Sequence, residues 1–196
     1  MPIPKQKLRE AAQMVLTSRG YAPVPVSGRG IVPGTRWKAT KGPAAGQQIA
    51  IRTPVTREVG FVRRDDKSGW RTISNSKIPE TVVAVPSLSD PESLIEVLCF
   101  DSKTMAAKFD AAVLKARDRT LYPNAPVFVA LDEIPQSGSG ALTGGLKAKA
   151  KWREEISVDL VSAKPPDEFF ERVKREFAER NGVDVSKVIV EFRIVA

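Results

Sequence analysis

The chain contains no histidine and a single cysteine among its 196 residues, and these two absences exclude several common enzyme chemistries. Without histidine there is no Ser-His-Asp triad, no Cys-His pair and no histidine-ligated zinc. One cysteine cannot form an intramolecular disulfide or a cysteine-rich metal site. Any metal would therefore have to bind carboxylate and carbonyl oxygens. We predict no cofactor, no metal site and no catalytic residue.

Long hydrophobic runs are also missing. No stretch of about 18 apolar residues occurs, so we expect no membrane span and no membrane contact. Residues 1–16 lack an apolar signal core and a cleavage site, which favours a reducing, cytoplasmic location. Hydrophobic residues nevertheless make up 42% of the chain, enough for a packed core in one domain or two small ones.

Acidic residues are scarce in the first part of the chain. Residues 1–80 hold 15 Lys+Arg against 5 Asp+Glu, whereas residues 81–196 hold 16 and 18, for a net charge of +8. This asymmetry favours a polyanionic partner, most simply nucleic acid. The alternative is that the positive charges form the solvated surface of an ordinary basic protein.

Hydrophobic periodicity predicts an α+β fold, in which helices flank a mixed β-sheet. Helices are expected over residues 5–18, 103–117 and 167–180. Strands are expected over residues 24–26, 36–40, 48–53, 58–63, 81–85, 94–100, 127–131, 155–161 and 187–195. Residues 65–69 have the composition of a hairpin loop that leads to a return strand at 70–73.

The segment 135–146 is rich in glycine and serine and resembles a linker. We therefore predict a basic core at 1–134, a Gly/Ser-rich linker or loop at 135–150, and a small C-terminal β-α-β subdomain at 151–196. That subdomain is too short to bury much surface alone. We expect it to pack on the core, on a protein partner or on a second copy in a homo-oligomer.

The order of the elements resembles that of the restriction-endonuclease-like (PD-(D/E)xK) nuclease superfamily. After the first helix comes the strand Ile49-Ala50-Ile51-Arg52-Thr53, followed by a hairpin containing an aromatic residue (EVGFVRR to WRTI). The strands TVVAV and LIEVLCFD and the helix from Ser102 complete the series. The resemblance covers about residues 3–117 and implies a mixed sheet flanked by helices.

The chain departs from that superfamily at the residues that perform the chemistry. Those nucleases use carboxylates to hold Mg²⁺ and a lysine to position or activate the attacking water. Ala50 stands where the second carboxylate belongs, and Arg52 stands where the lysine belongs. Arginine stays protonated and cannot accept a proton. Residues 20–57 contain no Asp or Glu, so the resemblance implies a degenerate core that holds a phosphate backbone without cutting it.

Basic residues of the N-terminal half are the predicted phosphate contacts, because Lys and Arg neutralise phosphates and release counterions. They are Arg29, Arg36, Lys38, Lys41, Arg52, Arg57, Arg63, Arg64 and Arg71. Trp37 and Trp70 lie beside basic residues, and each either stacks on a base or fills the core. A second basic patch contains Lys147, Lys149 and Lys151, which form either an arm that grips nucleic acid or a solvated end of the linker.

Two other features have less functional weight. The acidic pair Asp132-Glu133 follows a strand, where catalytic acids often sit, but without a basic partner motif we interpret it as a loop feature. Cys99 lies within an apolar strand and no histidine exists to activate it, so we interpret it as a buried core residue.

These observations predict a nucleic-acid-binding protein, with DNA favoured over RNA, that contacts phosphates without catalysis. A rearranged site that retains metal-dependent nuclease activity is the minor variant of this prediction. The alternative function is a protein-interaction module, such as an adaptor, an inhibitor or a subunit of a larger complex, with no nucleic-acid contact. In that case the edge of the last strand suits pairing with a partner strand.

Overall fold

A computed structural model of the chain describes residues 2–28, 31–63, 69–70, 73, 78–115, 125–162, 167–185 and 188. The chain divides into two compact units, Met1–Val161 and Ser162–Ala196. The fold is α+β, with a mixed sheet flanked by helices, as the hydrophobic periodicity predicts. None of the helices in the described ranges combines the length and apolarity needed to cross a membrane.

A six-stranded sheet forms the middle of the first unit, in the order β1-β2-β3-β5-β6-β9. Its strands are β1 (Pro23–Pro25), β2 (Arg36–Ala39), β3 (Gln48–Arg52), β5 (Glu80–Pro86), β6 (Leu94–Asp101) and β9 (Trp152–Ser157). Strands β3 and β5 are parallel, and the other neighbours are antiparallel. β1 contains two prolines and lies at an edge, where a missing ladder donor is tolerated.

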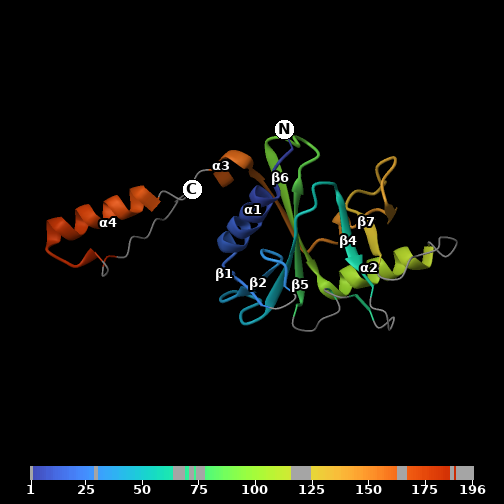
Figure 1. Cartoon of the computed structure of the whole chain (residues 1–196), viewed down its shortest axis with the longest axis horizontal. Coiled ribbons are helices and arrows are strands. Elements are labelled where there is room, and N and C mark those ends of the chain that lie inside the picture. Colours follow the sequence, from blue (N-terminus) through green and yellow to red (C-terminus); the bar gives the residue numbers. More distant parts are fainter. Residues whose placement is uncertain are drawn as a thin grey trace. The chain divides into compact units, whose positions relative to one another are not determined.

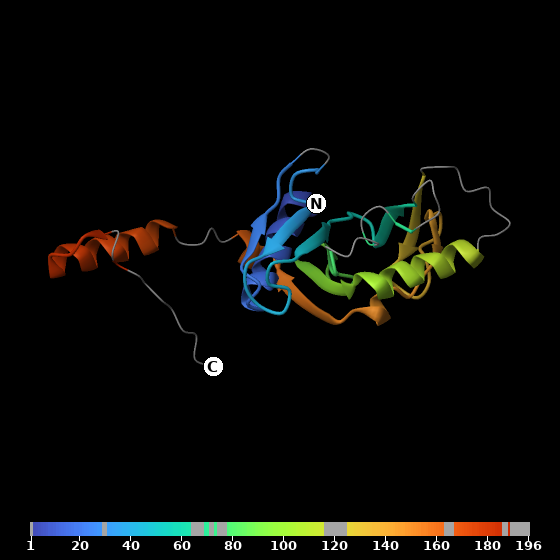
Figure 2. The ribbon, with the colours of Figure 1, turned by 90° about the horizontal axis from the view of Figure 1, so that it is seen from below.

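Both faces are covered at the middle strands β5 and β6 of this sheet. Helix α1 (Lys5–Ser18) packs on β5 and β6 from one side (Figure 1). A three-stranded sheet of β4 (Glu58–Val62), β7 (Pro126–Ala130) and β8 (Ala141–Thr143), together with helix α2 (Ser102–Lys115), lies on the other side. Figure 2 shows the same arrangement from below. Double coverage explains why β5 and β6 are continuous apolar runs rather than alternating ones.

Alternating residues of the central strands enter two separate cores. Cys99 faces the core beneath α1, whereas Leu98 and Phe100 face the core shared with the second sheet. Trp37 belongs to the first core and Trp70 to the second. Both tryptophans therefore fill the core, which is the second of the two roles considered for them.

The Gly/Ser-rich segment 135–150 is built into the first unit rather than linking two bodies. β8 pairs in parallel with β7, and the amides of Gly145 and Lys147 donate to the carbonyls of Asp132 and Leu131. At Gly144, a Cβ atom would lie 2.2 Å from the carbonyl oxygen of Glu133, so this approach requires glycine. These contacts hold the segment against the end of β7.

The chain then rejoins the main sheet earlier than the sequence pattern indicates. β9 begins at Trp152 and pairs with β6, whereas the strand was expected at 155–161. The short helix α3 (Val158–Ser162) occupies the second half of that range. Pairing with β6 therefore places β9 in the first unit, and the division between units falls after Val161 instead of at the expected linker.

The second unit contains helix α4 (Asp167–Asn181), which matches the helix expected at 167–180. Gly182, with φ of 63°, follows its end, as is common where a helix stops. Of the strand expected at 187–195, the structure describes Val188 alone. Most of the expected hairpin at 65–73 also lies outside the described residues, although Arg63 and Trp70 form an antiparallel bridge.

The packing of the central sheet allows a direct test. Leu98 is fully buried between the sheets, whereas Leu114 on α2 is 57% exposed. We expect Leu98→Ala to lower the free energy of unfolding by about 2–5 kcal/mol, because it leaves a cavity. Leu114→Ala should change it by less than about 0.5 kcal/mol. Urea denaturation measures both, and equal losses would contradict the described burial.

Candidate functional site

Strands β2 and β3 place three cationic side chains of the predicted set on one face of the sheet. Arg36 pairs in register with Ala50, Lys38 lies two residues further along β2, and Arg52 lies two residues beyond Ala50. Side chains two residues apart share a face. Because Trp37, between the first two, enters the core beneath α1, these three project from the opposite face. We call Arg36, Lys38 and Arg52 the cationic strand face.

Two effects act on the charge of Arg52 within this face. Burial lowers the pKa of Arg52, and the nearby charge of Arg36 lowers it further. The Arg52 guanidinium lies 4.8 Å from the centre of the Phe61 ring and donates a 3.2 Å hydrogen bond to the carbonyl of Ile51. Residues 11–57 contain no Asp or Glu.

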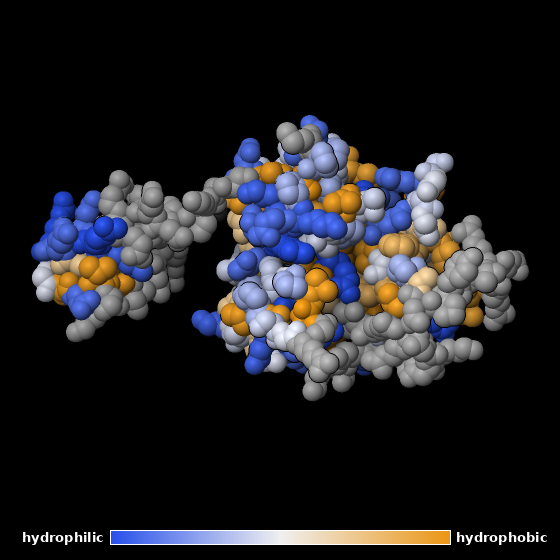
Figure 3. All heavy atoms as spheres, viewed as in Figure 1, coloured by the Kyte–Doolittle hydropathy of each residue, from blue (hydrophilic) through white to orange (hydrophobic). Residues whose placement is uncertain are grey.

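Accessibility differs among the basic residues of this edge. Lys38 is exposed, Arg36 and Arg52 are partly exposed, and Lys41 is exposed in the loop between β2 and β3. Figure 3 shows hydrophilic residues over much of the described surface of the first unit, with apolar patches among them. The cationic strand face and Lys41 are therefore an accessible part of the predicted basic surface.

Arg57 is not part of that surface. It is 7% exposed, and its Nε and Nη2 donate to the carboxylate of Asp132 at 2.7 and 3.0 Å. Nη2 also donates to Glu96 at 2.8 Å, and Nη1 donates to the carbonyl of Pro86 at 2.8 Å. Burial by itself lowers the pKa of Arg57, but hydrogen bonds to Asp132 and Glu96 outweigh it, so the pKa is raised. Its role is to join elements of the fold, which corrects its assignment as a phosphate contact.

The predicted stacking role of the two tryptophans is wrong for the same reason, because both rings are buried. Trp37 is 5% exposed and Trp70 is fully buried, with its indole Nε1 donating a 3.1 Å hydrogen bond to Asp110. A ring inside a core cannot stack on a base.

Arg63 is partly buried and its Nε lacks a hydrogen-bond partner among the described residues. The remaining predicted contacts, Arg29, Arg64 and Arg71, lie outside the described residues.

The C-terminal lysines do not form one arm. The segment Lys147–Lys149 is a 3₁₀ helix instead of an extended strand. Lys147 forms an ion pair with Glu96 at 2.5 Å, and Lys151 forms one with Glu80. The hydrogen bond to Glu80 raises the pKa of Lys151. Lys149 is exposed and forms no ion pair with a described residue.

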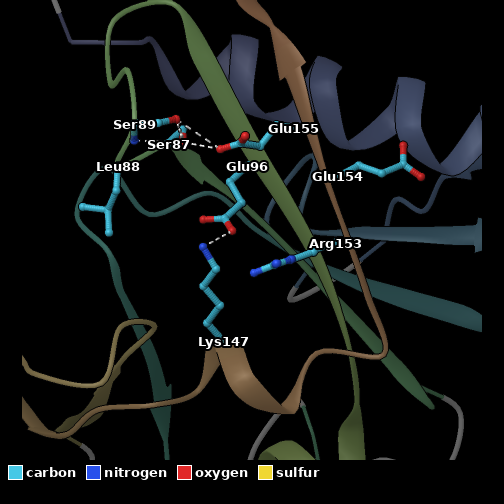
Figure 4. A pocket seen from close by; sticks show the side chains of 8 residues that line it. All are labelled: Ser87, Leu88, Ser89, Glu96, Lys147, Arg153, Glu154 and Glu155. Atoms are coloured by element: carbon cyan, nitrogen blue, oxygen red, sulfur yellow. Dashed lines mark hydrogen bonds and ion pairs between the residues drawn. The ribbon is translucent and has the colours of Figure 1, made fainter.

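A polar cavity of about 430 Å³ lies between the β5–β6 loop, β6, β9 and the 3₁₀ helix (Figure 4). It is lined by Ser87, Leu88, Ser89, Glu96, Lys147, Arg153, Glu154 and Glu155. Glu155 accepts hydrogen bonds from the hydroxyls of Ser87 and, at 3.4 Å, Ser89. The Glu154 side chain points away toward α1, where it pairs with Arg19 at 2.5 Å. A smaller cavity of about 280 Å³ shares Lys147 and Arg153.

Most of the charged side chains in and beside this cavity form ion pairs with one another. Glu96 is buried and is held by Arg57 and Lys147, and Asp132 is held by Arg57. The cluster therefore serves to connect the two sheets. Sequence reasoning missed it because Arg57 precedes Glu96 by 39 residues and Asp132 by 75.

No family model matches the chain, and no curated protein or solved structure is similar enough to indicate a relationship. The expected kinship with restriction-endonuclease-like proteins therefore stays a prediction.

The buried ion cluster makes a prediction about stability. Replacing Arg57 by methionine leaves Glu96 and Asp132 without their shared cation, so we expect a loss of about 3–5 kcal/mol in the free energy of unfolding. Arg19→Met is the matched control, because the Arg19–Glu154 pair is about one-third exposed and should contribute at most about 1 kcal/mol. Denaturant melts of both variants give the comparison. Equal losses would show that the cluster does not hold the sheets together.

The environment of Cys99 predicts its reactivity. Burial and the nearby charge of Glu80 raise the pKa of the thiol above its usual range. Because the thiolate is the nucleophile, we expect the native protein to resist an aromatic disulfide reagent at about pH 8. Each unfolded molecule has one accessible thiol and should therefore release one equivalent of the reagent's aromatic thiolate. Rapid reaction of the native protein would mean that the core beneath α1 opens readily.

Proposed function

We propose that the first unit binds the phosphate backbone of nucleic acid through the cationic strand face, with duplex DNA as the favoured partner. The supporting observation is that Arg36, Lys38 and Arg52 share one face of two neighbouring strands. That face belongs to a segment without a single acidic residue between positions 11 and 57. A concentration of positive charge on an ordered strand pair is the electrostatic feature that phosphate binding needs.

The chemistry of these side chains favours binding that is independent of sequence. Lys and Arg contacts to phosphates supply affinity and orientation but do not read base edges. Burial of Trp37 and Trp70 removes the stacking platform that single-strand binding uses, which favours a duplex. A phosphate oxygen near Arg36 and Arg52 would be attracted by both guanidinium groups.

The same face argues for binding without cleavage. Ala50, in place of the second carboxylate of the nucleases that the chain resembles, is fully buried beside the cationic strand face. Arg52, in place of their lysine, is partly buried against Phe61 and stays protonated. We propose a degenerate nuclease-like core that keeps phosphate contacts and performs no hydrolysis.

Binding should depend on these charges in a way that salt titration measures. We expect the affinity of the full chain for a fluorescent duplex to fall steeply as salt rises from about 50 to 200 mM. Because each lost phosphate contact lowers the slope of log K against log salt by about 1, the Arg36→Gln/Lys38→Gln double variant should lower it by about 2. The loss should be similar for unrelated duplex sequences. Fluorescence anisotropy gives all three results.

The matched control is Lys103→Gln/Lys115→Gln, which removes the same charge from exposed positions of α2. If this control weakens binding as much as the strand variant, the effect is one of net charge and the proposed face is wrong. If the wild-type chain does not bind any duplex or single strand at about 50 mM salt, where backbone contacts are strong, the alternative of a protein-interaction module is favoured.

A further inference from the structure

The two edges of the six-stranded sheet differ in their capacity to pair with another strand. β1 has three residues, two of which are Pro23 and Pro25. β9 has six residues with neither proline nor glycine, and no described strand lies on its outer side. Proline and short length are ways to block an exposed edge. β1 is therefore blocked, whereas β9 is a regular strand with one side open.

The peptide groups that face outward from β9 follow from the alternation of hydrogen bonds along β6. The carbonyl of Leu94 accepts from the amide of Ser87, next to β5, whereas the carbonyl of Ser93 accepts from the amide of Val158, next to β9. When a residue of β6 points its peptide groups toward β9, the residue opposite it on β9 points its own peptide groups toward β6. Val97 is such a residue, because it lies four positions after Ser93. Since Glu154 pairs with Val97, its peptide groups face β6. Those of its neighbours Arg153 and Glu155 face outward.

The sequence of β9 is complementary to itself when two copies run antiparallel. With Glu154 opposite Glu154 of the second copy, Arg153 lies opposite Glu155, and the same pair forms again by symmetry. On the other face, Trp152 lies opposite Ile156. Opposite charges and apolar pairs at facing positions both stabilise antiparallel strands. We propose that β9 pairs in this register with β9 of a second copy of this chain, extending the sheet across a two-fold axis.

Other registers are less favourable. A shift that places Arg153 opposite itself, or Glu155 opposite itself, brings like charges together at the centre of the pairing. A shift by one residue places the inward-facing peptide groups of one copy opposite the outward-facing groups of the other. The proposed register is the one that satisfies both the hydrogen bonds and the charges.

The central contact between the two Glu154 side chains is neutralised within each copy. Arg19 pairs with Glu154 at 2.5 Å, and its guanidinium lies 4.2 Å from the centre of the Trp152 ring. Two carboxylates at the axis are thus accompanied by two guanidinium groups. Trp152 and Ile156 are both partly exposed in a single copy, so pairing would bury apolar surface that is now in contact with water.

This pairing is separate from the proposed nucleic-acid contact. β9 and β1 are the opposite edges of the sheet, so a dimer through β9 leaves the cationic strand face of each copy open. Failure of one proposal does not affect the other, because the first is measured by self-association and the second by nucleic-acid affinity.

Sedimentation equilibrium of the full chain at rising concentration tests the pairing. We expect a monomer–dimer equilibrium for the wild type. Arg153→Glu should raise the dissociation constant by about tenfold or more, because two attractive charge pairs become repulsive. The double variant R153E/E155R exchanges the two charges and should restore the dimer. Lys149→Glu, the same change of charge on the neighbouring 3₁₀ helix, should leave the dimer unchanged.

Amide hydrogen exchange provides a second measurement. In the dimer the outward amides of Arg153 and Glu155 should exchange more slowly than in the R153E variant. A wild-type chain that stays monomeric up to about 0.1 mM overturns the proposal. So does a dimer that R153E leaves intact, or a folded R153E/E155R variant, checked by circular dichroism, that remains monomeric.

Discussion

The buried guanidinium of Arg57 connects three parts of the chain that are far apart in sequence. Arg57 directly precedes β4. Its guanidinium binds Glu96 on β6, Asp132 after β7 and the carbonyl at the end of β5. Each partner removed from water needs the others, because an unpaired buried charge costs several kcal/mol. The second sheet is thereby held in one position against the first. Glu96 and its partner Lys147 also line the polar cavity.

Locking the two sheets together determines which surfaces stay available. The second sheet and α2 cover the middle strands, so β5 and β6 are buried on both sides. The edges of the six-stranded sheet remain accessible, and they differ in character. One edge, made of β1, β2 and β3, comes from a segment without acidic residues. The other edge, β9, carries both signs of charge. A phosphate backbone suits the first edge, and a strand of the same sequence suits the second.

How well the positions of the predicted residues could be foreseen depended on how local the signal was. The two-residue period of strands, visible in the sequence, puts Arg36 and Lys38 on one side of a strand. That Arg52 shares this face follows from the register between β2 and β3 in the structure. Arg57 has the same charge and a similar neighbourhood in sequence, yet it is buried, because its partners are 39 and 75 residues away. For the same reason, the sequence could not decide whether the two tryptophan rings are buried or exposed. Their burial depends on α1 for Trp37 and on α2 for Trp70.

By itself the sequence determined the type of most elements, the α+β class and the uneven distribution of charge, because these depend on residue periodicity and composition. The tertiary structure decided which charges are accessible and which are neutralised. It also converted the Gly/Ser-rich segment 135–150 into part of the first unit, through pairing of β8 with β7 and close contact at Gly144. Such contacts join residues that no local pattern links, since a partner across a sheet is set by the path of the whole chain.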